Sequence, residues 1–482
     1  MRARLARGVP CPNERRTALV LASNTVLLLL LTNCTMGPNY KRPVVQAPVS
    51  YRGENADQAA AQASQSLGDE KWWEVFQDQE LQTLIRTALK QNFDVQIAAT
   101  RILEAQAQVV ITRAAQFPTV SFVPGISAVR SPGIPGVFSG YSYLADQLAF
   151  SGSWNLDFWG RYRRATEAAR AALRASEWGS RTVVMALVEN LAAAYFQLRE
   201  LDLELDIAKR TLGSRQESLK LTTTLERGGA TSMVDVRQAQ QLVETAAESI
   251  PDIERQIQQT EDQISVLLGQ NPESIPRGKP ITDQPLPQTI PAGLPSRLLE
   301  RRPDILRAEQ ELVAANAEIG VARAQLFPQI SLTGLGGFES IGLGNLAVWG
   351  ARFWNWSATA NQPIFNAGSL RANIRNAEAQ QQEALLTYKQ AIQSAFREVS
   401  DSLVAYQKYR EFREHQQQLT AAAQDAAHLS EIRYQGGAAS YLEVLTNETT
   451  YFTAELNLAR AQLSERVSLV EVYNALGGGW QQ

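Results

Sequence analysis

The stretch RYQGGAASYLEVL at residues 433–445 interrupts a long helical pattern with two adjacent glycines and restarts it at once. Glycine costs about 1 kcal/mol inside a helix, but it is favoured just past a helix end. Gly436 and Gly437 therefore predict a tight turn between two antiparallel helices. Ser440 stands where it can cap the returning helix with its hydroxyl group.

The same turn occurs earlier in the chain, which indicates a duplicated sequence. RGGATSMVDV at 227–236 matches QGGAASYLEV at 435–444, and ITRAAQFPTVSF at 111–122 matches VARAQLFPQISL at 321–332. The two shifts are nearly equal, so we expect two copies of one unit of about 200 residues. The four turn glycines are Gly228, Gly229, Gly436 and Gly437.

Each copy has the same order of predicted elements. A helix of about 23 residues ends at a Phe-Pro pair, where proline stops it, and two strand-like runs follow. The long helical stretches that come next, at 162–226 and 369–434, predict rods of about 97 Å. After the glycines comes a return helix of about 37 residues, and apolar residues recur with the coiled-coil period of about 3.5. The proline-rich segment between the copies predicts an extended connector.

The N-terminus predicts a lipoprotein signal peptide. Arg15 and Arg16 precede an apolar run that ends at Asn33-Cys34, and Leu31 stands three residues before the cysteine. We expect cleavage before Cys34 and acylation of its thiol, although a weak anchor helix followed by an ordinary cysteine would give a similar pattern. Thr35 is not the aspartate that would indicate retention in the inner membrane.

The strands alternate between apolar and small polar residues. In 148–158, for example, Phe150 and Trp154 alternate with Ser151 and Ser153. Both a soluble sandwich and a membrane barrel alternate in this way, and the export signal favours the barrel. Because four strands cannot close a barrel, several chains must contribute to it. Two chains would give eight strands with a filled interior, whereas three would give twelve strands and a passage.

Composition excludes several other classes of protein. The chain has 46 basic and 49 acidic residues, so no basic excess indicates nucleic acid. Its two cysteines, Cys11 and Cys34, and two histidines, His415 and His428, make a zinc site or a disulfide framework improbable on count alone. No nucleophile–base arrangement or phosphate-binding loop stands out. We therefore expect no enzymatic activity, no metal and no cofactor.

Several motifs together resemble a known family. The stretch LLERRPDILRAE at 298–309 is similar to the hallmark of outer-membrane factors of tripartite pumps, the TolC-type family. CTMGPNYKRP, LDFWGRYRR and the closing ALGGGW agree with its lipoprotein branch, which serves resistance-nodulation-division (RND) pumps. The resemblance covers nearly the whole mature chain. Pro303 and Asp304 suit a helix start, and we interpret Arg301 and Arg302 as structural ion-pairing groups.

The resemblance implies a fold, partners and a location. The fold would be mainly α-helical with a membrane β-barrel portion, and a homotrimer would place a 12-stranded barrel on an α-helical tunnel. The protein would be a passive, gated exit duct for drugs or other small solutes, lipid-anchored in the outer membrane of a Gram-negative bacterium and extending into the periplasm. Its partners would be a periplasmic adaptor protein, an inner-membrane RND pump and outer-membrane lipid. An outer-membrane duct of an ABC-type protein secretion system and a non-pore structural coiled-coil lipoprotein remain alternatives.

The predicted organisation follows from the duplication. It comprises a signal peptide (1–33), an N-terminal extended segment (34–78), a first repeat (79–269, strands about 119–129 and 144–158), a connector (270–302), a second repeat (303–477, strands about 329–339 and 350–364) and a C-terminal tail (478–482).

The two Gly-Gly turns would form the periplasmic tips, where we expect the closed state to be held. The predicted gate residues are Tyr434, Leu442 and Glu443 from the second copy and Arg227 and Asp235 from the first. The family often has an acidic residue at the position of Thr446, so Glu443 or an apolar ring of Leu442 would take that role here. Leu442 alternatively packs its own hairpin.

Overall fold

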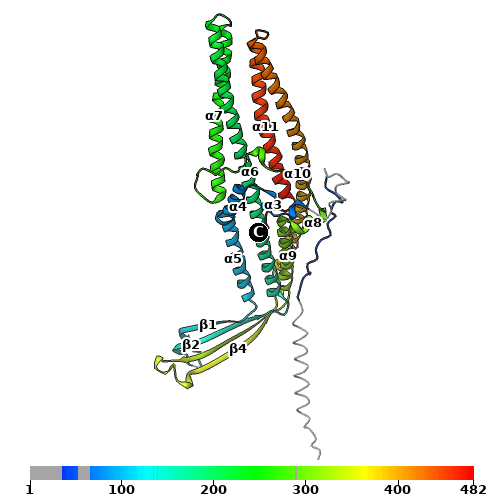
Figure 1. Cartoon of the computed structure of the whole chain (residues 1–482). Coiled ribbons are helices and arrows are strands. Elements are labelled where there is room, and N and C mark those ends of the chain that lie inside the picture. The colour runs from blue at the N-terminus through cyan, green and yellow to red at the C-terminus, as the bar shows by residue number, and fades with distance from the viewer. Residues whose placement is uncertain (1–34, 53–65, 134, 138, 288–289, 482) are drawn as a thin grey trace, which may run out of the picture. The chain divides into compact units, whose positions relative to one another are not determined.

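A computed structural model describes residues 35–52, 66–133, 135–137, 139–287 and 290–481 (Figure 1). The predicted signal peptide and Cys34 lie outside these residues. The chain forms two compact units. One contains Leu103–Arg174, Glu309–Leu386 and the N-terminal residues up to Pro43, and the other contains Val44–Ile102, Ala175–Ala308 and Thr387–Gln482. Apart from the one at Pro43–Val44, the unit boundaries fall within helices.

Helices dominate the described residues, and both copies contain the same series of them. The bounds are α3 (Trp72–Val75), α4 (Gln79–Gln91), α5 (Phe93–Ala114), α6 (Arg161–Arg227), α7 (Met233–Leu268), α8 (Pro295–Arg301), α9 (Pro303–Ala324), α10 (Ser369–Gln435) and α11 (Tyr441–Ala475). Short 3₁₀ turns lie at Leu67–Asp69, Ile281–Asp283, Leu343–Asn345 and Trp349–Ala351. Within the described ranges, no helix has both the length and the apolar composition needed to cross a membrane.

The first unit contains one antiparallel sheet of four strands in the order β1-β2-β3-β4 (Figure 1). The strands are β1 (Thr119–Ser131), β2 (Tyr141–Leu156), β3 (Gln329–Ser340) and β4 (Arg352–Asn361). Pairing of β2 with β3 joins the two copies of the duplicated unit in one sheet. Within the chain, β1 and β4 remain edge strands. The predicted combination of long helices with four strands is confirmed.

The residues that follow Cys34 are held against the same unit. The backbone N–H of Met36 donates to the carbonyl of Trp159 at 3.0 Å, and Arg164 Nε donates to the Met36 carbonyl at 3.1 Å. Gly37 has a φ of +93°, and a Cβ atom there would lie 2.5 Å from the Cα atom of Gly320. This close backbone contact requires glycine. The start of the described chain is therefore fixed beside the end of β2.

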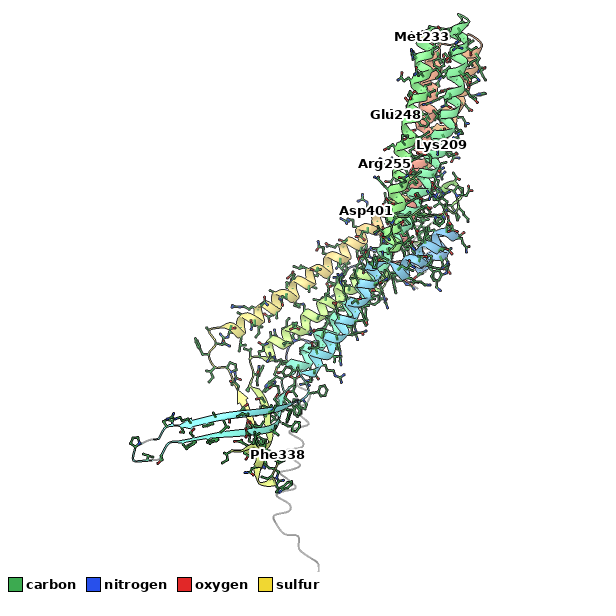
Figure 2. All side chains as sticks on the ribbon, turned by 90° about the vertical axis from the view of Figure 1, so that its left-hand side faces the viewer. Lys209, Met233, Glu248, Arg255, Phe338 and Asp401 are labelled. Carbon is green, nitrogen blue, oxygen red and sulfur yellow. The ribbon has the colours of Figure 1, made fainter. Side chains whose placement is uncertain are left out.

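The second unit contains two long hairpins, formed by α7 with most of α6 and by α11 with most of α10, which the views in Figures 1 and 2 show from two sides. Eight apolar residues of α6 between 187 and 212 follow the coiled-coil spacing, and six of them are buried, which fits knobs-into-holes packing. The six are Leu187, Leu191, Ala194, Leu198, Leu201 and Ala208, whereas Leu205 and Leu212 are half-buried. Burying each leucine side chain contributes about 1.5–3 kcal/mol. Apolar contacts thus hold the middle part of α6 against its neighbouring helices.

Candidate functional site

Small polar side chains form rows across all four strands on one face of the sheet. Thr119, Ser153, Thr333 and Ser357 stand opposite one another in register. The hydroxyl oxygens of Thr119 and Ser153 lie 2.8 Å apart, and those of Thr333 and Ser357 lie 2.9 Å apart. A neighbouring row continues the polar face with Asn155, Ser331 and Thr359. This face is suited to water.

The opposite face carries aromatic residues. Phe122 pairs with Phe150, whose ring centroid lies 5.3 Å away, and the same row continues through Gly336 to Trp354. The side chains of Trp354 and Trp356 are 76% and 71% exposed. Exposed tryptophans of this kind are expected where a strand faces lipid. Each strand therefore separates an aqueous face from an apolar face.

The two Gly-Gly turns have the same backbone geometry, as the sequence predicts. Gly229 and Gly437 adopt left-handed φ values of +73° and +71°, which favour glycine. The amide of Ala230 donates to the carbonyl of Leu225, and the amide of Gly229 donates to that of Glu226. Equivalent bonds form in the second turn. Both long helices thus end in a Schellman motif that satisfies their last carbonyl groups.

The starts of the two return helices differ. At the first tip, the Ser232 hydroxyl accepts from the Asp235 amide, and the Asp235 carboxylate accepts from the Ser232 amide. Hydrogen bonds from Thr231 and Ser232 lower the pKa of Asp235, outweighing a small effect of burial. At the second tip, Ser440 occupies the N-cap position but its side chain makes no capping bond. The predicted Ser440 hydroxyl cap is therefore wrong.

Glu443 also differs from Asp235 in its partner. Glu443 occupies the position of Asp235 in the second copy, yet its carboxylate accepts from Arg433 Nη1 at 2.6 Å across the turn. It is therefore not available to the backbone amide of Ser440, and the reciprocal capping box does not form. Here the Glu443–Arg433 ion pair closes the turn instead.

Of the predicted gate residues, Tyr434 and Asp235 share a contact through Thr231, whereas Leu442 and Arg227 are exposed. The hydroxyl of Tyr434 lies 3.4 Å from that of Thr231, which also donates to the carboxylate of Asp235. Tyr434 thus connects the second tip to the first. Leu442 is 56% exposed and Arg227 is exposed as well. The Thr446 hydroxyl donates to the carbonyl of Leu442 at 2.8 Å.

Ion pairs join the hairpins farther from the tips. Arg210 Nη2 lies 2.5 Å from Glu455 Oε1, and Arg460 Nε donates to Glu204 Oε1 at 2.8 Å. Glu204 is buried, so this pair is partly protected from solvent. Sequence reasoning missed both pairs, because each joins α6 to α11 across more than half of the chain and no local pattern marks it. Ion pairs between the hairpins therefore lie away from the tips, whereas an apolar cluster of Ala239, Tyr441 and Val444 joins the hairpins closer to them.

The RRPD stretch forms a buried ionic network. Arg302 donates to Glu398 at 2.6 Å, to Asp304 at 2.7 Å and to the carbonyl of Ala475 at 3.2 Å. Burial lowers the pKa of its guanidinium, but the pairs with Asp304 and Glu398 outweigh burial and raise it. Arg301 pairs with Asp69. Both arginines therefore connect distant segments, which fits the structural role inferred from the sequence.

Asp78 is a second buried polar centre. Its carboxylate caps α4 through the Glu80 amide and accepts from the Tyr195 hydroxyl at 2.9 Å, the Lys279 amide at 3.0 Å and Gln284 Nε2 at 2.6 Å. Burial raises the pKa of this carboxyl, but the hydrogen bonds outweigh it and lower the pKa. Asp78 thereby ties the connector to α4 and α6. Among the residues that the structure describes, no group of His, Cys, Asp and Glu side chains is arranged to hold a metal.

Comparison with known proteins agrees with these features. The family model for outer membrane efflux proteins matches residues 84–270 and 294–478. The chain is 36% identical to the toluene efflux pump outer membrane protein TtgC of Pseudomonas putida over 469 residues, covering 96% of each chain. It is 34% identical to the cation efflux system protein CusC of Escherichia coli over 458 residues, covering 94% of this chain and 97% of CusC.

A solved structure agrees as well. The open state of the MtrE outer membrane channel of Neisseria gonorrhoeae superposes with a TM-score of 0.83 at 30% identity. The alignment covers 93% of this chain and 99% of MtrE. With both copies of the duplicated unit matched by the family model, the chain belongs to the outer membrane efflux protein family.

Proposed function

We propose that this protein is the outer-membrane exit duct of a tripartite efflux system. It would accept small solutes from an inner-membrane RND pump through a periplasmic adaptor and release them outside the cell. The chain would act as a passive duct and perform no chemistry. The pump would supply the energy for transport. The in-register hydroxyl row Thr119–Ser153–Thr333–Ser357, opposite an aromatic face, is the observation that carries this proposal.

Three copies of the sheet would complete the duct. The edges β1 and β4 expose backbone groups that lipid cannot satisfy, so they need a partner within a membrane. If β4 of each chain pairs with β1 of the next chain in the trimer, the three sheets close a barrel of twelve strands, which is wide enough for an aqueous passage. The aromatic rows would then face lipid and the hydroxyl rows would line the passage.

The relatives favour small solutes over protein cargo. CusC is named for cation efflux and TtgC for toluene efflux, and neither name refers to protein secretion. The alternative of an ABC-type secretion duct would keep the same fold and change the cargo. A structural lipoprotein without a pore would not need the two-faced sheet. The particular solutes carried by this chain are a property of its pump.

The oligomeric state and the pore can be tested together. Native mass spectrometry of the detergent-solubilised protein should show three copies of the chain. The same preparation should conduct ions in a planar bilayer, because the hydroxyl rows would line a continuous aqueous path. A stable monomer with conductance would contradict the shared barrel, and a trimer that fails to conduct even after Leu442→Ala would favour the non-pore alternative.

We also propose that the tips hold the closed state. The Tyr434–Thr231 contact and the carboxylate of Asp235 would join the two hairpins of one chain, while Leu442 and Glu443 from three chains would narrow the passage. Arg227 would contribute positive charge at the rim. The exposure of Leu442 supports this role, because a residue that packs its own hairpin would be buried within the chain.

Leu442→Ala should raise the resting conductance and leave the melting temperature nearly unchanged. More than half of the side chain is exposed, so truncation leaves little cavity. Glu443→Gln should raise conductance less, because it removes charge and the Arg433 ion pair but preserves volume. Single-channel recording and thermal melting would be measured on both variants. Low conductance in both, with early melting of Leu442→Ala, would show that Leu442 packs the hairpin.

We propose that Cys34 is the mature N-terminal residue and carries acyl chains. Thr35 contacts Gly160 just beyond β2, where a Cβ atom would lie 2.9 Å from the Thr35 methyl group. This contact holds the residue next to Cys34 at an end of the sheet. Intact mass of the purified protein should correspond to residues 34–482 plus lipid. A mass that includes Asn33 without lipid would exclude cleavage and acylation at this site.

A further inference from the structure

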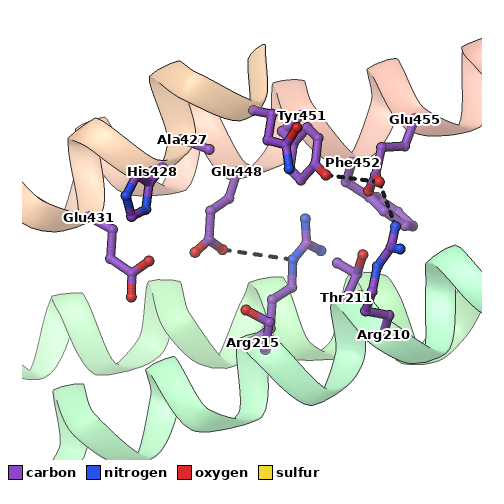
Figure 3. Close-up of a pocket in the computed structure, with 12 residues that line it drawn as sticks. Arg210, Thr211, Arg215, Ala427, His428, Glu431, Glu448, Tyr451, Phe452 and Glu455 are labelled. Carbon is purple, nitrogen blue, oxygen red and sulfur yellow. Dashed lines mark hydrogen bonds and ion pairs between the residues drawn. The ribbon is translucent and has the colours of Figure 1, made fainter. Parts of the chain in front are cut away.

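A polar cavity lies between the two hairpins of the second unit, away from the predicted gate residues (Figure 3). Its volume is ≈ 390 Å³, which is within the range of small-molecule pockets. Its walls come from α6 on one side and from α10 and α11 on the other, with Arg215, Glu448, Tyr451, Phe452 and Ala427 among them. We call it the inter-hairpin cavity.

Arg215 is the most informative residue of this cavity. Its side chain is only 2% exposed, although guanidinium groups are rarely buried without full pairing. Nη1 donates to the carbonyl of Leu242 at 2.9 Å, but Nε and Nη2 have no hydrogen-bond partner. The Phe452 ring covers the guanidinium, with its centroid 4.9 Å from Cζ. Two donors of a buried cation are thus left for another molecule.

Glu448 supplies an acceptor beside these donors. Its Oε2 atom lies 3.9 Å from Arg215 Nε, which is too far for a hydrogen bond, and it also has no hydrogen-bond partner. Figure 3 shows the two side chains reaching toward each other from α6 and α11. Burial raises the pKa of the Glu448 carboxyl, and the charge of Arg215 opposes this effect. The wall of the cavity therefore presents the hydrogen-bond donors of Arg215 beside the acceptor oxygen of Glu448.

The charged residues that line the inter-hairpin cavity limit the class of ligand that it can bind. Arg210 and Glu455 neutralise each other at 2.5 Å, and Glu431 adds a further carboxylate near Glu448. An anion would be repelled by these carboxylates, whereas a group with donors alone would leave Arg215 unsatisfied. A neutral primary amide meets both requirements, because its oxygen accepts from Arg215 and its NH₂ group donates to Glu448.

We propose that the inter-hairpin cavity binds neutral aromatic primary amides. The amide group joins Arg215 on the first hairpin to Glu448 on the second, and the aromatic ring lies against Tyr451, Phe452 and Ala427. Such a ligand contacts both hairpins at once, so it stabilises their association. The proposal does not depend on which solutes the duct exports.

Benzamide, benzoate and benzamidine form a matched series of probes, because they share a ring and differ in the polar group. Saturation-transfer NMR on the full-length protein in detergent would measure binding of each. We expect benzamide to bind, and benzoate and benzamidine to bind about tenfold more weakly or not at all. No benzamide binding, or tighter binding of either charged probe, would overturn the proposal.

Three variants locate the binding. Arg215→Met removes the unpaired donors, whereas Ala427→Phe fills the cavity and leaves both charged groups in place. Arg255→Met is the control, since Arg255 lies on α7 with its side chain 54% exposed (Figure 2). Benzamide binding should weaken about tenfold in Arg215→Met, vanish in Ala427→Phe and persist in Arg255→Met. Unchanged binding in Ala427→Phe would place the ligand elsewhere and refute the assignment, even if Arg215→Met failed to fold.

Discussion

Replacing Arg302 with methionine should destabilise the protein by about 2–4 kcal/mol, because it removes a buried cation that pairs with two partly exposed carboxylates. Glu398, Asp304 and the carbonyl of Ala475 would lose their shared donor. Burial, together with the charges of Glu471 and Glu398, already raises the pKa of nearby Glu189 to about 7, and Arg302 opposes that effect. Removing the guanidinium group of Arg302 would leave the carboxyl groups of Glu189, Glu398 and Glu471 without this neighbouring positive charge. Thermal melting and denaturant unfolding in detergent would measure the loss.

Two further variants distinguish the loss of the Arg302 network from a general effect of replacing an arginine. Arg302→Lys should recover part of the stability, because an ammonium group keeps the charge but lacks the planar fork that bonds two carboxylates. Arg397→Met on α10 should change stability little, since that side chain is 70% exposed. Equal melting of Arg302→Met and Arg397→Met would show that the buried network does not stabilise the fold.

Asp78→Ala should cost about 3–5 kcal/mol, because four donors lose one buried acceptor. The Tyr195 hydroxyl, Gln284 Nε2 and the Lys279 amide would each lose this acceptor, and α4 would lose its N-cap. We expect the connector to become susceptible to protease, which limited proteolysis with mass spectrometry would detect. Asp401→Ala is the control, with its side chain 75% exposed (Figure 2).

The contribution of Asp78 should also depend on pH. The pKa of its carboxyl is lowered in the folded protein from an unfolded value of 3.8, so the stabilisation is complete above pH 3.8 and is lost as the pH falls through the folded value. The stability difference between the native protein and Asp78→Ala should therefore shrink only in strong acid. A difference that disappears near neutral pH would contradict the assigned charge state.

Local patterns account for the part of the fold that the sequence predicts. The coiled-coil spacing along α6 marks the residues that become buried, such as Leu191 and Leu198, because each contact is made with a neighbouring helix at a regular interval. The glycine pairs mark the tips, since Gly229 and Gly437 must adopt positive φ. The alternation of apolar and polar residues along each strand predicts the two-faced sheet, because successive side chains of a strand point to opposite faces. These features depend on residues close together in the chain.

Long-range polar contacts account for what the sequence does not predict. Asp78 and Gln284 are 206 residues apart, and Arg302 and Ala475 are 173 apart. No periodicity connects such pairs, so the two buried networks and the inter-hairpin cavity emerge only from the folded chain. Ser440 shows a subtler limit, because its residue type and position predict a cap while the side chain makes none. The gate residues stay predictions, since they act between copies of the chain.

A duplicated gene begins with two identical halves, and one position at the tips shows how these halves have diverged. Asp235 stabilises the start of its own helix, whereas Glu443 is engaged by Arg433. A side-chain N-cap contributes about 1 kcal/mol and holds the first turn of α7, whose Met233 and Val234 are exposed. The first turn of α11 lacks that cap, but its Tyr441 and Val444 are buried in an apolar cluster with Ala239 of the other hairpin. Divergence has thus given one copy a helix start held by its own polar side chains and the other a helix start held by packing against its neighbour.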